Sequence, residues 1–381
     1  MVTPPATPRR TTHVDLEQRP ILVFWESTRA CLLACRHCRA EALPHPVAGE
    51  LTHAEAVSFI ETLADFGRPA PILVITGGDA LMRSDLLELV DAAKATGVPV
   101  ALAPSVTPLL TDERLGELRA RGVKVASLSL DGASAATHEG LRQVEGHFAD
   151  TLAALRRLRS HGFVVQVNTV VTAENREELP TIARIVHESG ASIWEVFFLV
   201  RVGRGTALGE LSSAENEDVC HFLYDASRHG FIVRTVEGPF FRRVVAWREE
   251  GRPVEAGPLY ARLAADLVEQ LGPPSSESKA QTKGTRDGRG IVFVSSTGDV
   301  YPAGFLPLVL GNVSEQPLAA LYREHPLLLD IRAARFSGRC GRCEYADLCG
   351  GSRARAYASS GDPLAEDPAC GYEPGSRASV A

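Results

Sequence analysis

Three cysteines near the beginning of the sequence, Cys31, Cys35 and Cys38, are spaced as CX3CX2C. Thiolates are the usual protein ligands of iron–sulfur clusters, and a cubane cluster needs four ligands. Three thiolates from one short loop leave one iron without a protein ligand, and an open coordination position can bind a small molecule. A zinc site that lacks its fourth ligand, or chance spacing, is the alternative interpretation. The motif therefore predicts a cubane cluster with one open iron.

A second group of cysteines lies towards the other end of the sequence. Cys340, Cys343 and Cys349 are spaced as CX2CX5C, and Cys370 follows Cys349 by 21 residues. In a reducing compartment, clustered cysteines are more often metal ligands than disulfide partners. Four thiolates can hold either a zinc ion or a fully ligated iron–sulfur cluster, and the residues alone leave both open. The remaining cysteine, Cys220, falls in an apolar segment and is expected to be a buried thiol.

The composition is that of an ordinary globular protein, since 45% of its 381 residues are hydrophobic and 23% are charged. A net charge of −7 gives no general attraction to nucleic acid or to an anionic membrane. The longest apolar stretches are too short to span a bilayer, and residues 1–12 lack the apolar segment of a secretory signal. We therefore expect a cytoplasmic protein with no membrane or nucleic-acid partner, and a disordered tail over residues 1–20.

Short apolar runs alternate with helical patterns between residues 21 and 236. The expected strands are Ile21–Trp25, Ile72–Thr76, Pro99–Ala103, Lys124–Leu130, Val164–Val171 and Ile193–Leu199. The expected helices are His53–Phe66, Asp85–Thr96, Asp112–Arg121, Phe148–His161 and Glu178–Ser189. Apolar strands that are each followed by a helix indicate a parallel sheet buried on both faces. Six such units predict an α/β fold, a partial (β/α)6 TIM-like barrel whose active-site residues lie where strands end and loops begin.

The pattern changes after residue 236. Residues 237–290 contain two helical stretches and then a segment rich in Gly, Pro, Ser and Lys, which predicts a helical linker and a flexible lid. A hairpin pattern follows at Ile291–Tyr301, and a short helix is expected at Leu318–Tyr322. We therefore expect a small α+β domain over residues 291–373, with a tail at residues 374–381.

In its position directly after the first strand of a partial barrel, the CX3CX2C motif resembles the signature of the radical S-adenosylmethionine (SAM) superfamily. The resemblance implies that Cys31, Cys35 and Cys38 bind a [4Fe–4S] cluster whose open iron chelates SAM. It also implies that an electron from the reduced cluster splits SAM into methionine and a 5′-deoxyadenosyl radical, which abstracts a hydrogen from the substrate. His37 occupies a position that is usually aromatic in the superfamily, and we expect it to pack beside the cofactor.

Further motifs follow the expected strands in the order that the superfamily requires. Gly77, Gly78 and Asp79 resemble its GGE motif, which holds the amino group of SAM, with Asp in place of the commoner Glu. Glycines allow a ligand to approach the backbone closely. Ser129, after the fourth strand, is similar to a residue that contacts the carboxylate or ribose of SAM, and Asn168 on the fifth strand is similar to a ribose contact. These five residues are the SAM contacts that the resemblance implies.

The second cysteine group resembles the SPASM/twitch extension of the same superfamily, an iron–sulfur domain that carries auxiliary [4Fe–4S] clusters. A full SPASM domain binds two such clusters, but two of its expected cysteines are missing here, one near Pro302–Gly304 and one at Arg353. The four cysteines that remain match the ligands of the distal auxiliary cluster: Cys340, Cys343, Cys349 and Cys370. The resemblance thus implies two [4Fe–4S] clusters in the chain, the second fully ligated by protein.

Two stretches near the end of the sequence resemble the haem-biosynthesis branch of the superfamily: Cys349–Tyr357 and Gly361–Cys370. This branch includes the siroheme-derived haem synthase and the maturase of d-type haem. These enzymes act on propionate side chains of iron tetrapyrroles, so the resemblance implies oxidative decarboxylation of an iron-porphyrin. Arginine and lysine suit carboxylate recognition. The candidate anchors are Arg201, Arg204, Lys283, Arg286 and Arg289. A solvated basic linker is the alternative interpretation of these residues.

Other functions stay open at this point. A peptide-modifying maturase shares the same architecture, and a tailoring enzyme that acts on a sugar or nucleoside would need the same cofactors. A zinc-stapled scaffold would need no SAM at all. A radical enzyme also implies a reducing partner, such as flavodoxin or ferredoxin.

Overall fold

The computed structural model describes residues 15–282 and 285–375, and within them ten strands form one continuous sheet. Seven strands run parallel in chain order: β1 (Leu22–Glu26), β2 (Ile72–Thr76), β3 (Val100–Leu102), β4 (Val125–Ser129), β5 (Val164–Val171), β6 (Ile193–Phe198) and β7 (Ile232–Val236). Six of them coincide with the predicted strands. The partial TIM-like barrel expected from the sequence is therefore confirmed, with β7 as an additional parallel strand.

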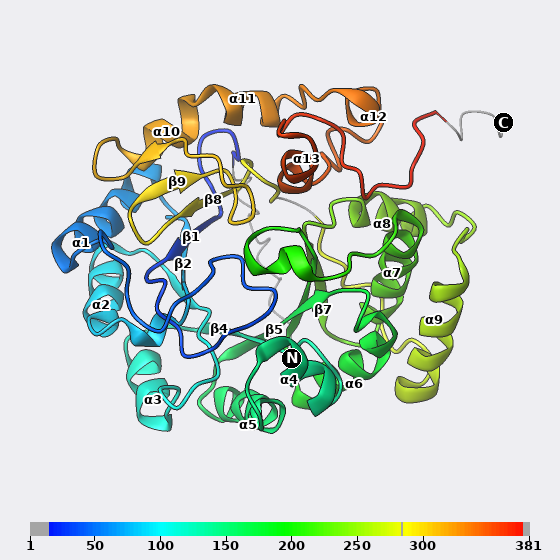
Figure 1. Cartoon of the computed structure of the whole chain (residues 1–381), viewed down its shortest axis with the longest axis horizontal. Helices are drawn as coiled ribbons and strands as arrows, with labels where there is room; N and C mark the ends of the chain where they lie inside the picture. The colour runs from blue at the N-terminus through cyan, green and yellow to red at the C-terminus, as the bar shows by residue number, and fades with distance from the viewer. Residues whose placement is uncertain (1–14, 283–284, 376–381) are drawn as a thin grey trace, which may run out of the picture.

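Helices cover the outer face of the sheet (Figure 1). Five of them correspond to predicted helices: α1 (His53–Thr62), α2 (Leu86–Thr96), α3 (Asp112–Ala120), α5 (His147–Ser160) and α6 (Leu179–Ser189). In α1, Thr52 and Glu55 form a capping box, in which each side chain accepts from the other residue's backbone N–H. Phe59 and Ile60 of the same helix are buried in the main core. The predicted ranges agree with these helices to within one residue at each end, except that α1 stops at Thr62 and a 3-10 helix, η1 (Leu63–Phe66), completes the predicted range His53–Phe66.

Alternating burial separates the two faces of the strands. In β5, Val165 and Val167 are buried against the outer helices, whereas Gln166 and Asn168 keep accessible surface. Successive side chains of a strand point to opposite faces, so Gln166 and Asn168 face the interior of the barrel. Since these inward-facing side chains remain accessible, the carboxyl-end half of the barrel offers a polar interior surface.

The connector after β7 differs from the prediction. It contains α8 (Phe241–Glu249) and α9 (Pro258–Leu271), but the segment that follows is not a flexible lid throughout. Gln281 donates its backbone N–H to Val233 in β7 at 2.8 Å, and the Val233 N–H donates to Lys279 at 3.2 Å. The side chain of Lys279 also donates to the carbonyl of Gly230. Backbone pairing with β7 therefore orders residues 279–281, although their composition is that of a linker.

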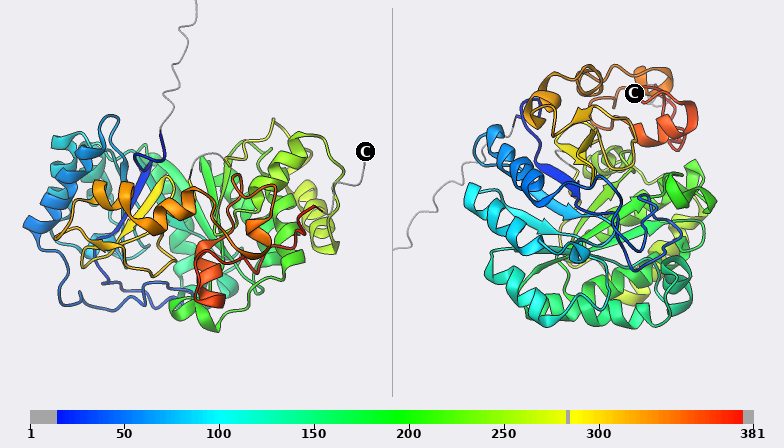
Figure 2. Two further views of the ribbon diagram at one scale, coloured as in Figure 1. Left: turned by 90° about the horizontal axis from the view of Figure 1, so that it is seen from above. Right: turned by 60° about the vertical axis from the view of Figure 1, so that its left-hand side comes forward.

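The C-terminal elements join the barrel sheet instead of forming a separate one. β8 (Ile291–Val294) pairs in parallel with β1, and β9 (Asp299–Tyr301) and β10 (Gly311–Asn312) continue as antiparallel strands. Figure 2 shows these yellow strands beside the blue β1. The predicted hairpin is confirmed, while the expected boundary at residue 290 falls within one continuous sheet.

Four short helices complete the C-terminal region: α10 (Leu318–Glu324), α11 (Pro326–Arg332), α12 (Gly338–Gly341) and α13 (Arg353–Ser360). Arg355 of α13 donates to the carbonyls of Leu199 and Glu237 at 3.2 and 2.9 Å, which ties the helix to the ends of β6 and β7. Among the described residues, no helix combines the length and apolar character needed to cross a membrane. Cys220, in α7 (Ser213–Ala226), is fully buried, as expected.

Candidate functional site

The first cysteine group lies in the loop that leaves the carboxyl end of β1. Cys31 and Cys35 are 6% and 7% exposed and form a small apolar cluster with Leu33 and Ala42, against which Cys38 packs. The backbone N–H of Cys31 donates to the carbonyl of Leu43 at 2.7 Å, which closes the loop on itself. The structure thus brings together the three cysteines that the CX3CX2C motif predicted as ligands.

Each of the three sulfur atoms meets a hydrogen-bond donor. The N–H of Leu33 donates to Cys31 at 3.3 Å, and the N–H of Ala42 donates to Cys38 at 3.5 Å. The guanidinium of Arg142 donates to Cys35 at 3.7 Å. Burial raises the pKa of the Cys31 thiol, so its thiolate form depends on a bound metal. Buried sulfurs with N–H donors fit a thiolate-ligated cluster, and three of them leave one iron open.

The glycines after β2 allow close contact with this loop. A Cβ on Gly77, whose φ is +153°, would lie 2.4 Å from the carbonyl oxygen of Thr28, and one on Gly78 would lie 2.3 Å from that of Ala30. No other residue fits at either position without movement of the backbone. The predicted motif therefore has a structural role in this loop in addition to any contact with SAM.

The carboxylate of Asp79 is fully buried and turned towards the loop after β3. It accepts hydrogen bonds from the hydroxyl of Thr107 at 2.8 Å and from the N–H groups of Ser105 and Leu81. Burial raises its pKa although these donors oppose the shift. Ser105 in turn donates from its hydroxyl to the carbonyl of Gly78 at 3.1 Å. The side chain of Asp79 thus positions the motif, and the backbone of the motif is what faces the cysteine loop.

Ser129 and Asn168 are direct neighbours in the register of β4 and β5. The side-chain carbonyl of Asn168 accepts from the amide nitrogen of Gln166 at 2.8 Å, and the same nitrogen donates to Glu195 of β6 at 2.9 Å. This bridge fixes the amide of Asn168 so that its own nitrogen is left to donate into the barrel. Burial raises the pKa of Glu195, with Arg234 of β7 opposing the shift.

Asp131, in the Ser-Leu-Asp-Gly segment after β4, connects several buried groups. Its carboxylate pairs with Arg142 at the end of α4 (Ala135–Arg142) and lies 3.6 Å from the ring of His37. Burial lowers the pKa of His37 to about 4, so this ring is neutral near pH 7. Within the cysteine loop, the ring of His37 is surrounded by the carboxylate of Asp131 and the guanidinium groups of Arg142 and Arg204, and its packing beside the cofactor stays a prediction.

Arg142 was not identified from the sequence because α4 is only eight residues long and was not among the predicted helices. Its buried side chains are those of His138 and Leu141 alone among the described residues of the helix. The Arg142–Cys35 contact joins residues 107 positions apart. The one available sign was Asp131 beside the predicted Ser129, because a carboxylate at a strand end needs a partner when it is buried.

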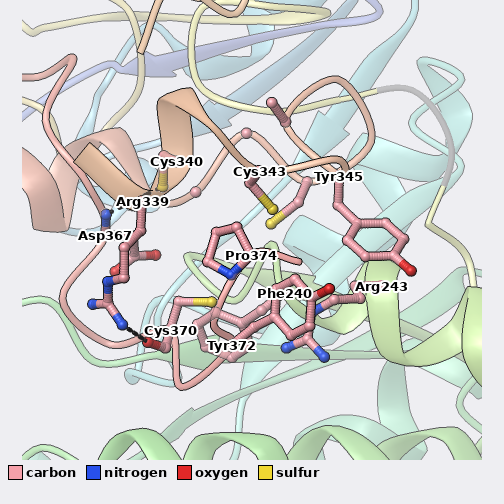
Figure 3. A pocket seen from close by; sticks show the side chains of 14 residues that line it. Phe240, Arg243, Arg339, Cys340, Cys343, Tyr345, Asp367, Cys370, Tyr372 and Pro374 are labelled. Carbon is pink, nitrogen blue, oxygen red and sulfur yellow. Dashed lines mark hydrogen bonds between the residues drawn. The ribbon is translucent and has the colours of Figure 1, made fainter. Parts of the chain in front are cut away.

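The second cysteine group lines a single pocket (Figure 3). The side chains of Cys340, Cys343, Cys349 and Cys370 surround it together with aromatic and basic residues. Burial raises the pKa of Cys349 to about 12 and that of Cys370 to about 11. Thiols with such pKa values stay protonated unless a metal replaces the proton. Four thiols that line one pocket are the donor set of a fully ligated metal group, and their role as ligands of an auxiliary cluster stays a prediction.

Arginine side chains approach this pocket from several directions. Arg243 and Arg339 line it, and Arg243 is 2% exposed and paired with Glu217 at 2.6 Å. Arg353 occupies one of the positions where SPASM domains have a further cysteine, and its guanidinium lies 3.7 Å from the sulfur of Cys340. A positively charged donor thus faces the cysteine group where an additional ligand was expected and is absent.

Two of the predicted substrate anchors hold the backbone together instead. Arg204 donates from Nε to the carbonyl of Cys35 at 2.9 Å and from Nη1 to that of Ala42 at 3.1 Å. Arg286 is 8% exposed and donates to four backbone carbonyls, those of Ile331, Arg332, Ala346 and Asp347. Through these backbone contacts Arg204 shapes the cysteine loop and Arg286 joins C-terminal segments, while Nη2 of Arg204 and Nε of Arg286 are buried without a hydrogen-bond partner among the described residues.

Of the other three predicted anchors, the structure describes Arg201 and Arg289. Arg201 follows β6 at the barrel mouth, where it is exposed and donates to the carbonyl of Thr206. Arg289 lies 3.6 Å from Glu17 on the opposite side of the sheet edge, near the N-terminal segment. Lys283 falls outside the described residues. The structure does not gather the four described basic residues, Arg201, Arg204, Arg286 and Arg289, into one site.

Comparisons with known proteins give the following matches. A sequence model described as the radical SAM superfamily matches residues 25–186. The AdoMet-dependent heme synthase of Methanosarcina barkeri is 37% identical over 96% of this chain and 100% of that protein. Pre-heme d1 synthase of Dinoroseobacter shibae is 30% identical over 97% of this chain and 88% of that protein. The crystal structure of Streptococcus suis SuiB bound to S-adenosylmethionine superimposes with a TM-score of 0.65 at 15% identity, over 93% of this chain and 78% of that one.

Proposed function

Because the chain belongs to the radical SAM superfamily, we propose that it converts propionate side chains of an iron tetrapyrrole to vinyl groups in haem-type biosynthesis. The observation that carries this proposal is the 37% identity with an AdoMet-dependent heme synthase over the full length of that relative. Similarity to pre-heme d1 synthase supports the same class of substrate.

The superfamily binds one [4Fe–4S] cluster and SAM, and Cys31, Cys35 and Cys38 are our proposed cluster ligands. When bound, the cluster supplies the electron that splits SAM into methionine and a 5′-deoxyadenosyl radical. The backbone of Gly77 and Gly78 would accept from the amino group of SAM. Ser129 and the amide nitrogen of Asn168 would donate to its carboxylate or ribose from inside the barrel.

The balance of the reaction requires a one-electron acceptor. Removal of one hydrogen atom from the propionate, followed by loss of CO2, leaves a vinyl group and releases one electron. We propose that a second [4Fe–4S] cluster, held by the cysteines at 340, 343, 349 and 370, accepts this electron. Positive charge around a cluster favours its reduced state. The approach of Arg243, Arg339 and Arg353 to these thiols supports that role.

An apolar surface at the barrel mouth suits a large flat ligand. Residues after β6 pack there against the C-terminal region, and Phe197 faces Phe305 with ring centroids 6.2 Å apart. The partly buried side chains around them are Val202, Ile291, Leu308 and Tyr357. Half-accessible apolar side chains of this kind are typical of ligand sites. Arg201 lies next to this surface in the sequence and is the predicted anchor that we retain for a substrate carboxylate.

The decisive experiment is anaerobic incubation of the reconstituted protein with iron-coproporphyrin, SAM and a reductant, such as reduced flavodoxin or ferredoxin. Mass spectrometry should detect the loss of CO2 and two hydrogen atoms for each propionate converted, with one 5′-deoxyadenosine formed each time. Deoxyadenosine without any change in the porphyrin, and no saturable porphyrin binding, would contradict the substrate. Peptides and sugar or nucleoside substrates would then be tested in the same assay.

A further inference from the structure

We propose that Arg142, fixed in place by Asp131, raises the reduction potential of the SAM-binding cluster through its hydrogen bond to Cys35. Arg142 is then a positioning residue that acts on the cluster through a ligand, without contact to the reacting atoms. The inference rests on the proposed function only in that Cys31, Cys35 and Cys38 hold the cluster. It does not depend on the identity of the substrate.

The geometry of Arg142 places one charge between two partners. Its side chain is 11% exposed, with Nη1 3.7 Å from the sulfur of Cys35 and Nη2 paired with the carboxylate of Asp131. An arginine side chain keeps its charge at ordinary pH, and this one lies between the carboxylate of Asp131 and the sulfur of Cys35. The guanidinium therefore stays charged beside the ligand sulfur.

Asp131 is held firmly from both sides. Its Oδ1 accepts from the backbone N–H of Val170 in β5 at 2.8 Å. Its own N–H donates to Nδ1 of His138 at 3.1 Å, and Nε2 of His138 lies 2.8 Å from Nδ1 of His147. Burial lowers the pKa of His138 to about 3, so this pair is neutral and adds no competing charge. A carboxylate anchored in this way prevents the guanidinium of Arg142 from turning away from Cys35.

The sign of the effect follows from electrostatics. Reduction adds one negative charge to the cluster and its thiolates, and a nearby buried cation stabilises that charge with little screening by solvent. A charge-assisted N–H···S hydrogen bond also stabilises the reduced cluster and so raises its reduction potential. Asp131 opposes the effect in part, but it meets the other nitrogen of the guanidinium, so the cation is the group next to the sulfur.

Redox titration of the full chain without SAM tests this inference. The reduced cluster is followed by electron paramagnetic resonance, and its signal is assigned by the change that SAM addition causes. Three replacements separate charge from hydrogen bonding: Arg142→Lys keeps the charge, Arg142→Gln keeps a donor alone, and Arg142→Met keeps neither. The matched control is Arg36→Gln, because Arg36 is adjacent to Cys35 in sequence but 40% exposed and paired with Glu174 at 3.1 Å.

We expect Arg142→Gln and Arg142→Met to lower the ratio of reduced to oxidised cluster at a fixed potential by about tenfold or more. For a one-electron couple, tenfold corresponds to about 59 mV. Arg142→Lys should fall between these variants and the wild type, and Arg36→Gln should change the ratio by less than about twofold because solvent screens its charge.

Three results would overturn the inference. One is a SAM-free potential in Arg142→Met equal to that of Arg36→Gln. Another is an unchanged potential with weakened SAM binding, which would make Arg142 a SAM contact. The last is loss of the cluster iron from Arg142→Lys and Arg142→Gln alike, which would make Arg142 necessary for assembly of the site. If no cluster forms at these cysteines in the wild type, the proposed function fails, and that outcome is recognised before any variant is compared.

Discussion

The two cysteine groups differ in how their sulfur atoms are surrounded. In the first, three sulfurs lie in one loop, and each meets a single N–H donor. In the second, four sulfurs come from a longer stretch of chain and share a pocket with arginine and tyrosine side chains. A site with three ligands leaves room for exchange of a small molecule, whereas four protein ligands favour electron transfer. On our proposal, the same ligand chemistry would therefore support two different tasks in one chain.

The largest effect is expected at the first group. Replacement of Cys31, Cys35 or Cys38 by Ala should abolish formation of 5′-deoxyadenosine, because the loss of one thiolate disrupts the cluster that holds and reduces SAM. The assay is chromatographic detection of deoxyadenosine under reducing, anaerobic conditions. Cys220→Ala is the control, since Cys220 is a fully buried thiol of α7. It should retain SAM cleavage at a stability cost of about 1 kcal/mol. Activity of a wild-type level in any of the three cluster variants would exclude the mechanism.

Variants of the second group should separate SAM cleavage from product formation. Two cubanes correspond to about eight iron and eight sulfide per chain after reconstitution. Replacement of both Cys343 and Cys349 by Ala should leave about four of each, retain deoxyadenosine formation and stop release of the vinyl product. Iron and sulfide assays measure the first result, and mass spectrometry the second. Stoichiometric zinc in anaerobically purified wild-type protein would contradict the auxiliary cluster.

A smaller effect is expected at the barrel mouth. Arg201→Ala should weaken binding of iron-coproporphyrin by about tenfold, since a charge-assisted hydrogen bond contributes about 1.5–3 kcal/mol. Difference absorbance measures the titration. Arg262→Ala is the control for the loss of a surface charge. Arg262 lies on α9, is 54% exposed and pairs with Glu177. Equal affinity of both variants would keep the substrate class and remove Arg201 as an anchor.

The smallest effect concerns the junction between the two regions, where the hydroxyl of Ser352 donates to Glu237. Burial and the carboxylate of Asp287 raise the pKa of Glu237 to about 8. A carboxyl group whose pKa is raised by folding stabilises the folded state fully at pH values below its unfolded-state pKa of about 4.3. This stabilisation is lost as the pH rises towards the folded-state pKa of about 8. Glu237→Gln should therefore reduce the fall in melting temperature between pH 5 and pH 8.5, measured by circular dichroism. A fall as steep as that of the wild type would show that Glu237 is ionised throughout.

The strands and the cysteine groups could be predicted because their determinants are local. Each strand of the barrel is a short apolar run, and each ligand set has a short spacing. By contrast, α4 is only eight residues long and was not among the predicted helices. The burial of Asp79 depends on Ser105 and Thr107, which belong to another loop.

The predicted substrate anchors also depend on contacts that local sequence patterns do not reveal. The presence of arginine at these positions predicted recognition of a substrate carboxylate. In the structure, Arg204 and Arg286 instead donate to backbone carbonyls of segments that are distant in the sequence. Composition predicted a flexible lid before β8, whereas pairing with β7 orders residues 279–281. In each case a long-range contact decided the outcome, and the sequence contains no local trace of it.

The parallel pairing of β8 with β1 affects how the protein is made. During synthesis, Leu22–Glu26 leaves the ribosome long before Ile291–Val294, so one side of β1 has no partner for most of translation. Unpaired strand edges promote intermolecular association, and pairing over such a long separation is slow. A chain that stops before β8 would keep that edge exposed. We therefore expect the newly made barrel to need protection from aggregation until the last quarter of the chain has emerged.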